Sequence, residues 1–333
     1  MKSVKIMFII IMAMGTLIAV SSYSWISMWI GLEINLLALI PLLSDNNNLF
    51  PSESALKYFI TQSLASAILL FSVITSLNLN EIMFMNWKEL LMVILSSAIF
   101  TKMGAAPFHA WFPEVLEGLD WVNSMLLLTW QKIAPMVILM YNINMTSLLT
   151  TIIIMSSVMG GVMGINQVSL RKIMAYSSIN HMGWMLASML YSQSIWTIYF
   201  VIYSMITANL VLMFYKLSSF YLKQLFNSMN KNKKMKFFFM MNFLSLGGLP
   251  PFLGFFPKWL TINSMIMSKF ITLSLILIVS TLITLFFYMR ITFSTLTINS
   301  AEPKLNTPKI YSFNIIISNF LTITGLALCT LIY

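Results

Sequence analysis

The sequence has very little charge and a single cysteine, and both shortages limit what the protein can be. Only 8% of its 333 residues are charged, whereas 59% are hydrophobic. A soluble domain carries charge on roughly a quarter of its residues. We therefore predict a polytopic membrane protein with little mass outside the bilayer. The one cysteine, Cys329, excludes an intrachain disulfide framework and a cysteine-based metal site.

Recognisable cofactor motifs are also missing. The sequence has no G-x-G-x-x-G fingerprint, phosphate-binding Walker loop, haem pattern or cysteine cluster. We expect the chain to bind no redox cofactor, nucleotide or metal of its own. Its formal charge of +10 would elsewhere suggest a nucleic-acid partner. Here the basic residues fall in short predicted loops, where they set membrane topology, so no nucleic acid is expected.

What the sequence does contain is a series of apolar runs long enough to cross a bilayer as helices, which takes roughly 17–25 residues. We count eleven, near residues 4–21, 25–43, 56–77, 89–112, 121–141, 148–165, 170–190, 194–217, 237–264, 270–292 and 312–331. No linker divides the chain. The prediction is an all-α, polytopic transmembrane helix bundle forming one integral membrane domain over residues 1–333.

The basic residues between these runs predict the orientation. With the N-terminus inside, twelve fall on the inner side and two outside, a strong positive-inside bias that leaves the C-terminus outside. The inner set is Lys2, Lys5, Lys57, Arg171, Lys172, Lys223, Lys231, Lys233, Lys234, Lys236, Lys304 and Lys309, and the outer set is Lys88 and Lys269.

Glycine and proline interrupt two of the predicted spans. The fourth is broken at Gly104–Pro107 and the ninth at Gly247–Pro251. Because these spans are five apart, they cross the membrane in opposite directions, as discontinuous helices do in inverted-repeat transporters. Two unrelated proline kinks are the alternative. The repeats would cover residues 4–141 and 148–292, with a final helix at 312–331.

Four charged side chains fall inside apolar spans: Glu33, Lys102, Lys132 and Lys258. Each costs about 2.5–3.5 kcal/mol at the centre of a helix on insertion scales. One acid cannot pair with three bases, so at least one lysine is neutral, hydrated or matched by another subunit. A carboxylate favours a protonated amine and desolvation favours the neutral one. Movement of Glu33 relative to Lys102 would therefore load or unload a proton, and the set predicts a proton path. The alternative is a buried ion pair that only fixes helix register.

Two histidines are weaker candidates for the same path. His109 follows the first break, and His181 lies among serine and asparagine residues in AYSSINHMGWM. Either could relay protons. A packing role is an equally good interpretation of both.

Two further patterns concern packing and anchoring. Gly160 and Gly164 have the G-x-x-x-G spacing that permits close approach of helices in membranes. Tyr288 and Arg290 stand near the inner end of the tenth span, where we expect them to anchor the helix at the membrane interface.

Six segments together closely resemble the NADH dehydrogenase subunit 2 family, the mitochondrially encoded, antiporter-like membrane subunits of respiratory complex I. The resemblance covers about residues 25–295, and the combination of motifs is highly specific. The segments are GLEINLLALIPLL, KYFITQSLASAILL, TKMGAAPFHAWFPEV, LLLTWQKIAP, LRKIMAYSSINHMGWM and LGGLPPFLGFFPKW.

The resemblance implies a fold and a set of site residues. The fold would be two inverted five-helix repeats with a final helix; animal members lack the first three of the fourteen bacterial helices. Glu33 matches the family's glutamate, and Lys102 matches the broken-helix lysine paired with it. Lys132 matches the central bridging lysine, and Lys258 matches the lysine of the second broken helix.

The resemblance also implies a setting. It places the chain in the mitochondrial inner membrane, with the N-terminus in the matrix and the C-terminus in the intermembrane space. Other membrane subunits of complex I and lipids, including cardiolipin, would be its partners. FMN, iron–sulfur clusters and ubiquinone would lie in or near other subunits.

The function predicted is therefore proton translocation as a membrane subunit of NADH:ubiquinone oxidoreductase, with no redox active site in this chain. A stand-alone secondary cation/proton antiporter is the alternative, and would have to transport ions as an isolated chain. An inert scaffold subunit is a third reading, which four charges retained in apolar spans disfavour.

Overall fold

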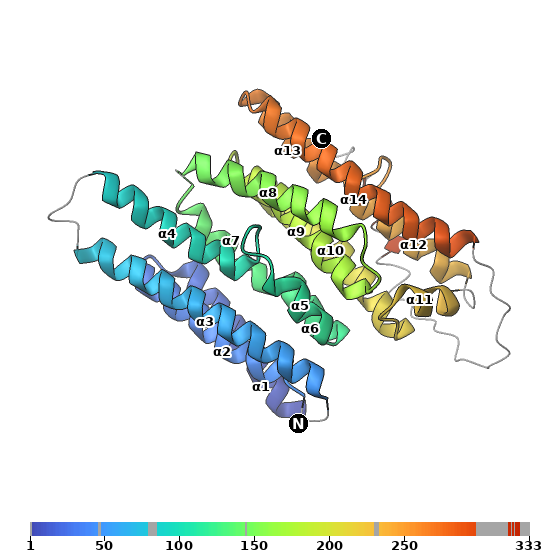
Figure 1. Ribbon diagram of the computed structural model, residues 1–333, viewed down its shortest axis with the longest axis horizontal. Coiled ribbons are helices and arrows are strands. Elements are labelled where there is room, and N and C mark those ends of the chain that lie inside the picture. The colour runs from blue at the N-terminus through green and yellow to red at the C-terminus, as the bar shows by residue number, and fades with distance from the viewer. Residues whose placement is uncertain are drawn as a thin grey trace. The chain divides into compact units, whose positions relative to one another are not determined.

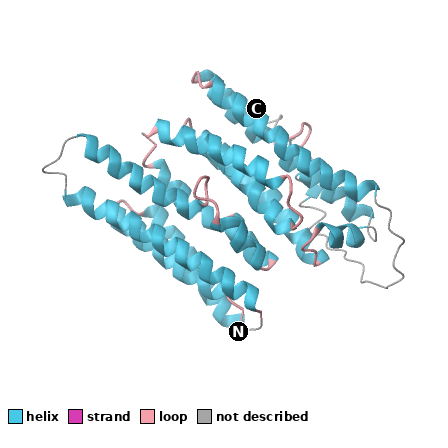
Figure 2. Cartoon of the chain, in the orientation of Figure 1, coloured by secondary structure: helices cyan, strands magenta, loops and turns pink. Residues whose placement is uncertain are grey.

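A computed structural model describes residues 2–45, 48–78, 85–143, 145–229, 233–297, 319–320, 322 and 324–326. Every regular element in these ranges is a helix, apart from one isolated bridge between Ser169 and Tyr221 (Figure 2). The all-α prediction is confirmed. Most of the predicted final helix, 312–331, lies outside the described residues, as do Cys329 and much of the basic run at 230–234.

The chain divides into two compact units, Met1–Ile152 and Ile153–Tyr333. The first unit contains α1 (Lys2–Ser21), α2 (Trp25–Leu43), α3 (Leu49–Asn78), α4 (Met85–Met103), α5 (Trp111–Gly118), α6 (Trp121–Leu128), the 3-10 helix η2 (Trp130–Lys132), α7 (Ile133–Met140) and the start of α8 (Thr146–Gly164). The second contains the rest of α8, then α9 (Leu170–Met189), α10 (Gln193–Leu217), α11 (Leu222–Met229), α12 (Lys233–Gly247), α13 (Phe255–Met267) and α14 (Ile271–Thr297) (Figure 1). The assignment of two repeats stays a prediction.

Seven of the described helical stretches are long and apolar enough to cross a membrane, including α1, α2 and α3. These three helices pack side by side in the first unit (Figure 1). Serine and threonine hydroxyls on these helices donate to carbonyls one turn earlier in the same helix; Thr16, for example, donates to the carbonyl of Ala13 at 2.7 Å. Such bonding satisfies polar side chains where no water is available.

Both predicted breaks are present. The first separates α4, which ends at Met103, from α5, and the second separates α12, which ends at Gly247, from α13. Each begins with a glycine in the left-handed region, Gly104 at φ 73° and Gly248 at φ 76°. Only glycine adopts that conformation without steric cost, and it commonly ends helices. The local fold of each break therefore follows from its sequence.

The two breaks also match each other residue by residue. Aligned on their first glycine, they share glycine, proline, phenylalanine, phenylalanine and proline at the same positions without a gap. The first set is Gly104, Pro107, Phe108, Phe112 and Pro113, and the second is Gly248, Pro251, Phe252, Phe256 and Pro257. Under this alignment the starts of α5 and α13 coincide.

The fifth predicted span, 121–141, contains an interruption that the sequence analysis did not predict. The α-helix stops at Leu128, passes through η2, and resumes as α7 at Ile133. Pro135 is the third residue of α7, where its missing N–H leaves no intrahelical bond unmade. The proline thus favours a new helix start, which places Lys132 in the 3-10 turn.

The G-x-x-x-G prediction is confirmed in the second unit. A methyl group added at Gly160 would lie 2.6 Å from the backbone nitrogen of Asn180 on α9, and one at Gly164 would lie 2.8 Å from the ring of Phe287 on α14. These glycines therefore permit α8 to approach both neighbours.

The anchoring prediction is wrong for Tyr288. Its side chain is 1% exposed and packs against Phe243 and Phe287, with ring centroids 5.6 and 4.6 Å away. The tyrosine faces the interior because α14 is rotated so that this face meets α12. Arg290 is exposed, as expected, and lies 3.5 Å from the carbonyl of Gln167.

The described part of the final segment is tied to α12 by buried polar groups. The Asn242 amide donates to the side-chain oxygen of Asn319, and the Thr322 hydroxyl donates to the side-chain oxygen of Asn242 at 3.1 Å. All three side chains are buried. This cluster holds the segment against the helix that leads into the second break.

We expect Gly160→Ala to lower the amount of folded protein, because the added methyl meets the backbone of α9 rather than a movable side chain. Overpacking of this kind costs about 1–3 kcal/mol. The steady-state level in membranes measures the loss. Gly247→Ala is the control, since its methyl would make only an ordinary contact, 3.6 Å from the Leu285 side chain. Equal levels of the two variants would contradict the close-packing account.

Candidate functional site

Glu33 lies in the middle of α2 and is half-buried. One of its carboxylate oxygens, Oε2, is fully buried and has no hydrogen-bond partner among the residues that the structure describes. Its negative charge acts on Lys102 and on the buried phenol of Tyr58. Among the described residues no salt bridge joins Glu33 to Lys102; the two that occur both involve Lys57. Glu33 is thus a carboxylate that influences Lys102 electrostatically without direct contact.

Lys102 is the penultimate residue of α4, directly before the first break, and its side chain is 7% exposed. Its Nζ makes no hydrogen bond to any described residue. The backbone around it is nevertheless capped. The Gln62 amide on α3 donates to the Lys102 carbonyl at 3.4 Å, and the Trp111 indole on α5 donates to the Thr101 carbonyl at 3.0 Å.

Lys132 is 2% exposed and lies in η2, with its Nζ 5.5 Å from the centre of the Phe112 ring. Phe112 is also the side chain that packs against Gly104 at the break. The neighbouring Gln131 donates to the side-chain oxygen of Asn35 on α2 at 2.9 Å. Cation–π contact with Phe112 stabilises a buried ammonium without neutralising it.

His109 lies in the segment between α4 and α5 and is 9% exposed. Its Nδ1 is 3.3 Å from the Pro107 carbonyl, which can only accept, so the proton on this nitrogen faces the backbone. The first unit therefore gathers Glu33, Lys102, Lys132 and His109 around the first break.

Lys258 lies at the second break, on the helix that follows it rather than on the helix that precedes it. It is 6% exposed on α13, and its Nζ donates to the Gly247 carbonyl at 2.9 Å and the Leu246 carbonyl at 3.4 Å. The Nζ also lies 5.7 Å from the centre of the Trp184 ring on α9. The ammonium thus caps the free carbonyl end of α12, where the helix dipole is negative.

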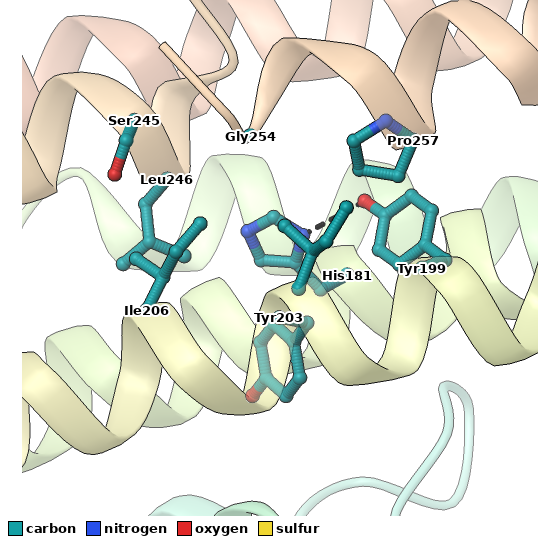
Figure 3. Close-up of a pocket in the computed structure, with 9 residues that line it drawn as sticks. His181, Tyr199, Tyr203, Ile206, Ser245, Leu246, Gly254 and Pro257 are labelled. Atoms are coloured by element: carbon teal, nitrogen blue, oxygen red, sulfur yellow. Dashed lines mark hydrogen bonds between the residues drawn. The ribbon is translucent and has the colours of Figure 1, made fainter. Parts of the chain in front are cut away.

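His181 lies on α9, one turn before Trp184, and faces a small pocket beside the second break (Figure 3). Its Nδ1 is 2.9 Å from the Tyr199 hydroxyl, and the Tyr203 ring lies 5.1 Å from the imidazole. Residues from α9, α10 and both sides of the break line the pocket: His181, Tyr199, Ile202, Tyr203, Ile206, Ser245, Leu246, Gly254 and Pro257. The second unit therefore places His181 near the break that carries Lys258.

Several side chains that complete these sites were not predicted from the sequence. Trp184 and Tyr199 gave no signal, because aromatic residues are common in any apolar span. Gln62 and Asn35 did give one, since a buried amide in an apolar helix needs a partner. Among the described residues no group of three or more histidine, cysteine, aspartate or glutamate side chains could hold a metal ion.

Comparisons with known proteins agree on one family. The family described as "NADH:quinone oxidoreductase/Mrp antiporter, TM" matches residues 22–284. NADH-ubiquinone oxidoreductase chain 2 of Anopheles gambiae is 45% identical over 98% of this chain and 97% of its own.

Two solved structures share the fold. A chain of respiratory complex I from Thermus thermophilus has a TM-score of 0.86 at 23% identity, covering 98% of this chain and 77% of its own. A chain of the Mrp complex from Dietzia sp. has a TM-score of 0.78 at 13% identity, covering 98% and 75%. At such identities these likenesses show the fold alone.

We expect Gly248→Ala to destabilise the second break. The new methyl would lie 2.7 Å from the Cδ of Lys258, and alanine at φ 76° costs about 1–2 kcal/mol in addition. The melting temperature of the detergent-solubilised protein should fall. Gly247→Ala is the matched control, because its nearest contact is an ordinary 3.6 Å. A melting temperature equal to that of the control would show that the left-handed turn is dispensable.

Proposed function

The chain belongs to the NADH-ubiquinone oxidoreductase chain 2 family, and from this membership we propose that it translocates protons as a membrane subunit of complex I. NADH oxidation and ubiquinone reduction take place in other subunits. The observation that carries the proposal is the presence of buried lysines at two helix breaks. Lys102 and Lys132 are buried at the first, and Lys258 caps the second.

Proton movement in the first unit follows from the electrostatics of Glu33 and Lys102. The carboxylate favours the protonated form of the amine, while burial favours the neutral form. A displacement that weakens the influence of Glu33 releases a proton from Lys102, and its return draws one in. Among the described residues, Glu33 Oε2 has no hydrogen bond that would hold this oxygen against such a displacement.

Lys132 and Lys258 extend the path. Lys132 receives the proton as the central bridging lysine, and its contact with Phe112 connects it to the first break. Lys258 carries the proton in the second repeat. His109 and His181 are additional relay positions, since each is buried beside a break. Repeats at 4–141 and 148–292 and a final helix at 312–331 complete this reading.

The setting proposed is the mitochondrial inner membrane, with the N-terminus in the matrix and the C-terminus in the intermembrane space. The other membrane subunits of complex I and lipids such as cardiolipin are the partners. The assembled complex supplies electron transfer through FMN, iron–sulfur clusters and ubiquinone in or near other subunits. This chain contributes the proton-carrying side chains.

A stand-alone antiporter is the competing function, because the matching family also includes Mrp antiporter subunits. The Dietzia chain shares the fold at 13% identity, which carries no function across. The 45% identity to a chain 2 protein favours complex I. Reconstitution of the isolated chain into proteoliposomes distinguishes the two functions. If the chain works only as a complex I subunit, it should show no cation/proton exchange, and exchange at an antiporter rate would support the alternative.

We expect Glu33→Gln to lower the number of protons pumped per NADH oxidised while the complex still assembles. The amide keeps the volume of the side chain but loses the charge that acts on Lys102. Lys132→Met should also lower the ratio, because it removes the amine beside the Phe112 ring that is proposed to receive the proton. Proton translocation and NADH oxidation are measured together in intact membranes. Glu33→Asp, which keeps the charge, is the control. A wild-type ratio in Glu33→Gln would remove this carboxylate from the path.

A further inference from the structure

The described residues of the second unit carry many positive charges and include no carboxylate side chain. Between Asp120 and Glu302 the sequence has no aspartate or glutamate, although most lysine and arginine residues of the chain lie there. In the first unit, by contrast, the exposed Lys57 lies 3.0 Å from Glu53 and 3.4 Å from Glu114. Membrane topology does not require this lack of acids, because aspartate and glutamate contribute little to the positive-inside bias. The charge therefore calls for an anionic partner.

Most of these cations lie at one end of the second unit, where α9, α11 and α12 begin and α10 and α14 end. The Leu170 N–H at the start of α9 donates to the Phe220 carbonyl beyond α10 at 2.9 Å, and α11 contacts both α12 and α14 (Figure 1). At the opposite end of these helices, Lys269 is the one cation that the structure describes. We call the cationic surface the basic end, and it consists of Arg171, Lys172, Lys216, Lys223, Lys236 and Arg290.

Short contacts draw the parts of the basic end together. Arg290 on α14 lies 3.5 Å from the carbonyl of Gln167, in the segment that precedes α9. The Leu222 N–H at the start of α11 donates to the carbonyl of Val168 in the same segment at 3.3 Å. The cations of α9, α11 and α14 therefore belong to one continuous surface.

The short helix α11 turns its charged face outward. Leu225 and Met229 are completely buried, whereas Lys223 and Gln224 are exposed. The Gln224 side-chain oxygen accepts from the Phe220 N–H at 2.9 Å, which fixes the start of the helix. A helix with one apolar and one polar face is typical of segments that lie in the membrane interface.

Exposed apolar and aromatic side chains accompany the cations of the basic end. Tyr215 directly precedes Lys216, and Phe237 directly follows Lys236. Aromatic and long basic side chains gather at the membrane interface, where the charge reaches the headgroups and the apolar part stays with the acyl chains. A ligand with a charged head and apolar chains fits this surface better than a soluble anion does. The exposed set is Val168, Tyr215, Tyr221, Phe237 and Phe293.

We propose that the basic end binds the headgroups of anionic phospholipids. The inference rests on the lipid partnership in the proposed function and deepens it, because it names the surface and the class of headgroup. A basic residue near an anionic membrane surface gains an attraction that neutral headgroups do not supply. Since six cations share this surface, several of them contact headgroup phosphates at the same time.

The test adds phosphatidylglycerol to the full chain in a neutral detergent and measures the apparent Kd by native mass spectrometry. The loss of one cation near an anionic surface corresponds to about a fivefold change in affinity. Lys223→Gln and Arg290→Gln should therefore each weaken binding about fivefold. Both side chains are exposed, so each variant should keep the wild-type melting temperature.

Lys269→Gln is the matched control, because it removes an exposed cation from the opposite end of the same unit. Its Kd should equal that of the wild type, and Arg290→Lys, which keeps the charge, should bind nearly as well. Equal weakening in Lys269→Gln would overturn the inference, since the effect would then follow net charge alone. Loss of folding in both Lys223→Gln and Arg290→Gln would also overturn it, by making the two cations structural.

Two further ligands identify what is bound. Phosphatidylcholine has the same acyl chains without net charge and should bind more weakly than phosphatidylglycerol. Inorganic phosphate has the charge without the chains and should not displace the lipid. Equal binding of phosphatidylcholine, or displacement by inorganic phosphate, would contradict a surface for anionic phospholipids.

The outcome separates this inference from the proposed function. If phosphatidylglycerol binds Lys223→Gln and Arg290→Gln as tightly as the wild type, the basic end is not the site, and the lipid partnership stands. If no phospholipid binds the wild-type chain, that partnership fails as well.

Discussion

The structure depends on one constraint: a polar group inside a bilayer must find its partner within the protein. Backbone carbonyls freed by a helix break cost several kcal/mol each if they face lipid. This chain breaks two helices inside apolar segments and places lysines at both. At the first break the carbonyls of Thr101 and Lys102 accept from Trp111 and Gln62, and at the second the Gly247 carbonyl accepts from Lys258. The breaks are therefore tolerated because neighbouring helices supply those donors.

The same constraint applies to the buried lysines. Lys102, Lys132 and Lys258 are all at most 7% exposed, and one carboxylate cannot neutralise three ammonium groups. Each lysine has instead a different environment: the field of Glu33, the ring of Phe112, or the carbonyls of Gly247 and Leu246. Groups whose charged form is only partly stabilised change protonation when their surroundings shift slightly. A row of such groups suits a protein that moves protons.

The fold tolerates wide sequence change because a residue that faces lipid has few requirements beyond an apolar side chain. Chains that are 23% and 13% identical superpose with TM-scores of 0.86 and 0.78. Most lipid-facing positions need only to be apolar. Positions that carry specific constraints are few, such as Gly160 against α9 and the glycines that begin each break. Family membership is accordingly shown by a relative that is 45% identical over 98% of this chain. The distant structures show only that the fold is shared.

The sequence by itself determined the all-α class, the two breaks and the four charges that lie inside apolar runs, because apolar run length and the backbone chemistry of glycine and proline are local properties. The turn at Lys132, the burial of Tyr288 and the bond from Gln62 to the Lys102 carbonyl were decided only by tertiary structure. Gln62 and Lys102 lie forty residues apart, and their contact requires α3 and α4 to pack at one particular rotation. In a chain that is apolar on nearly every face, hydrophobic periodicity does not set that rotation. Packing between helices sets it, and it decides which lysine is held by carbonyls.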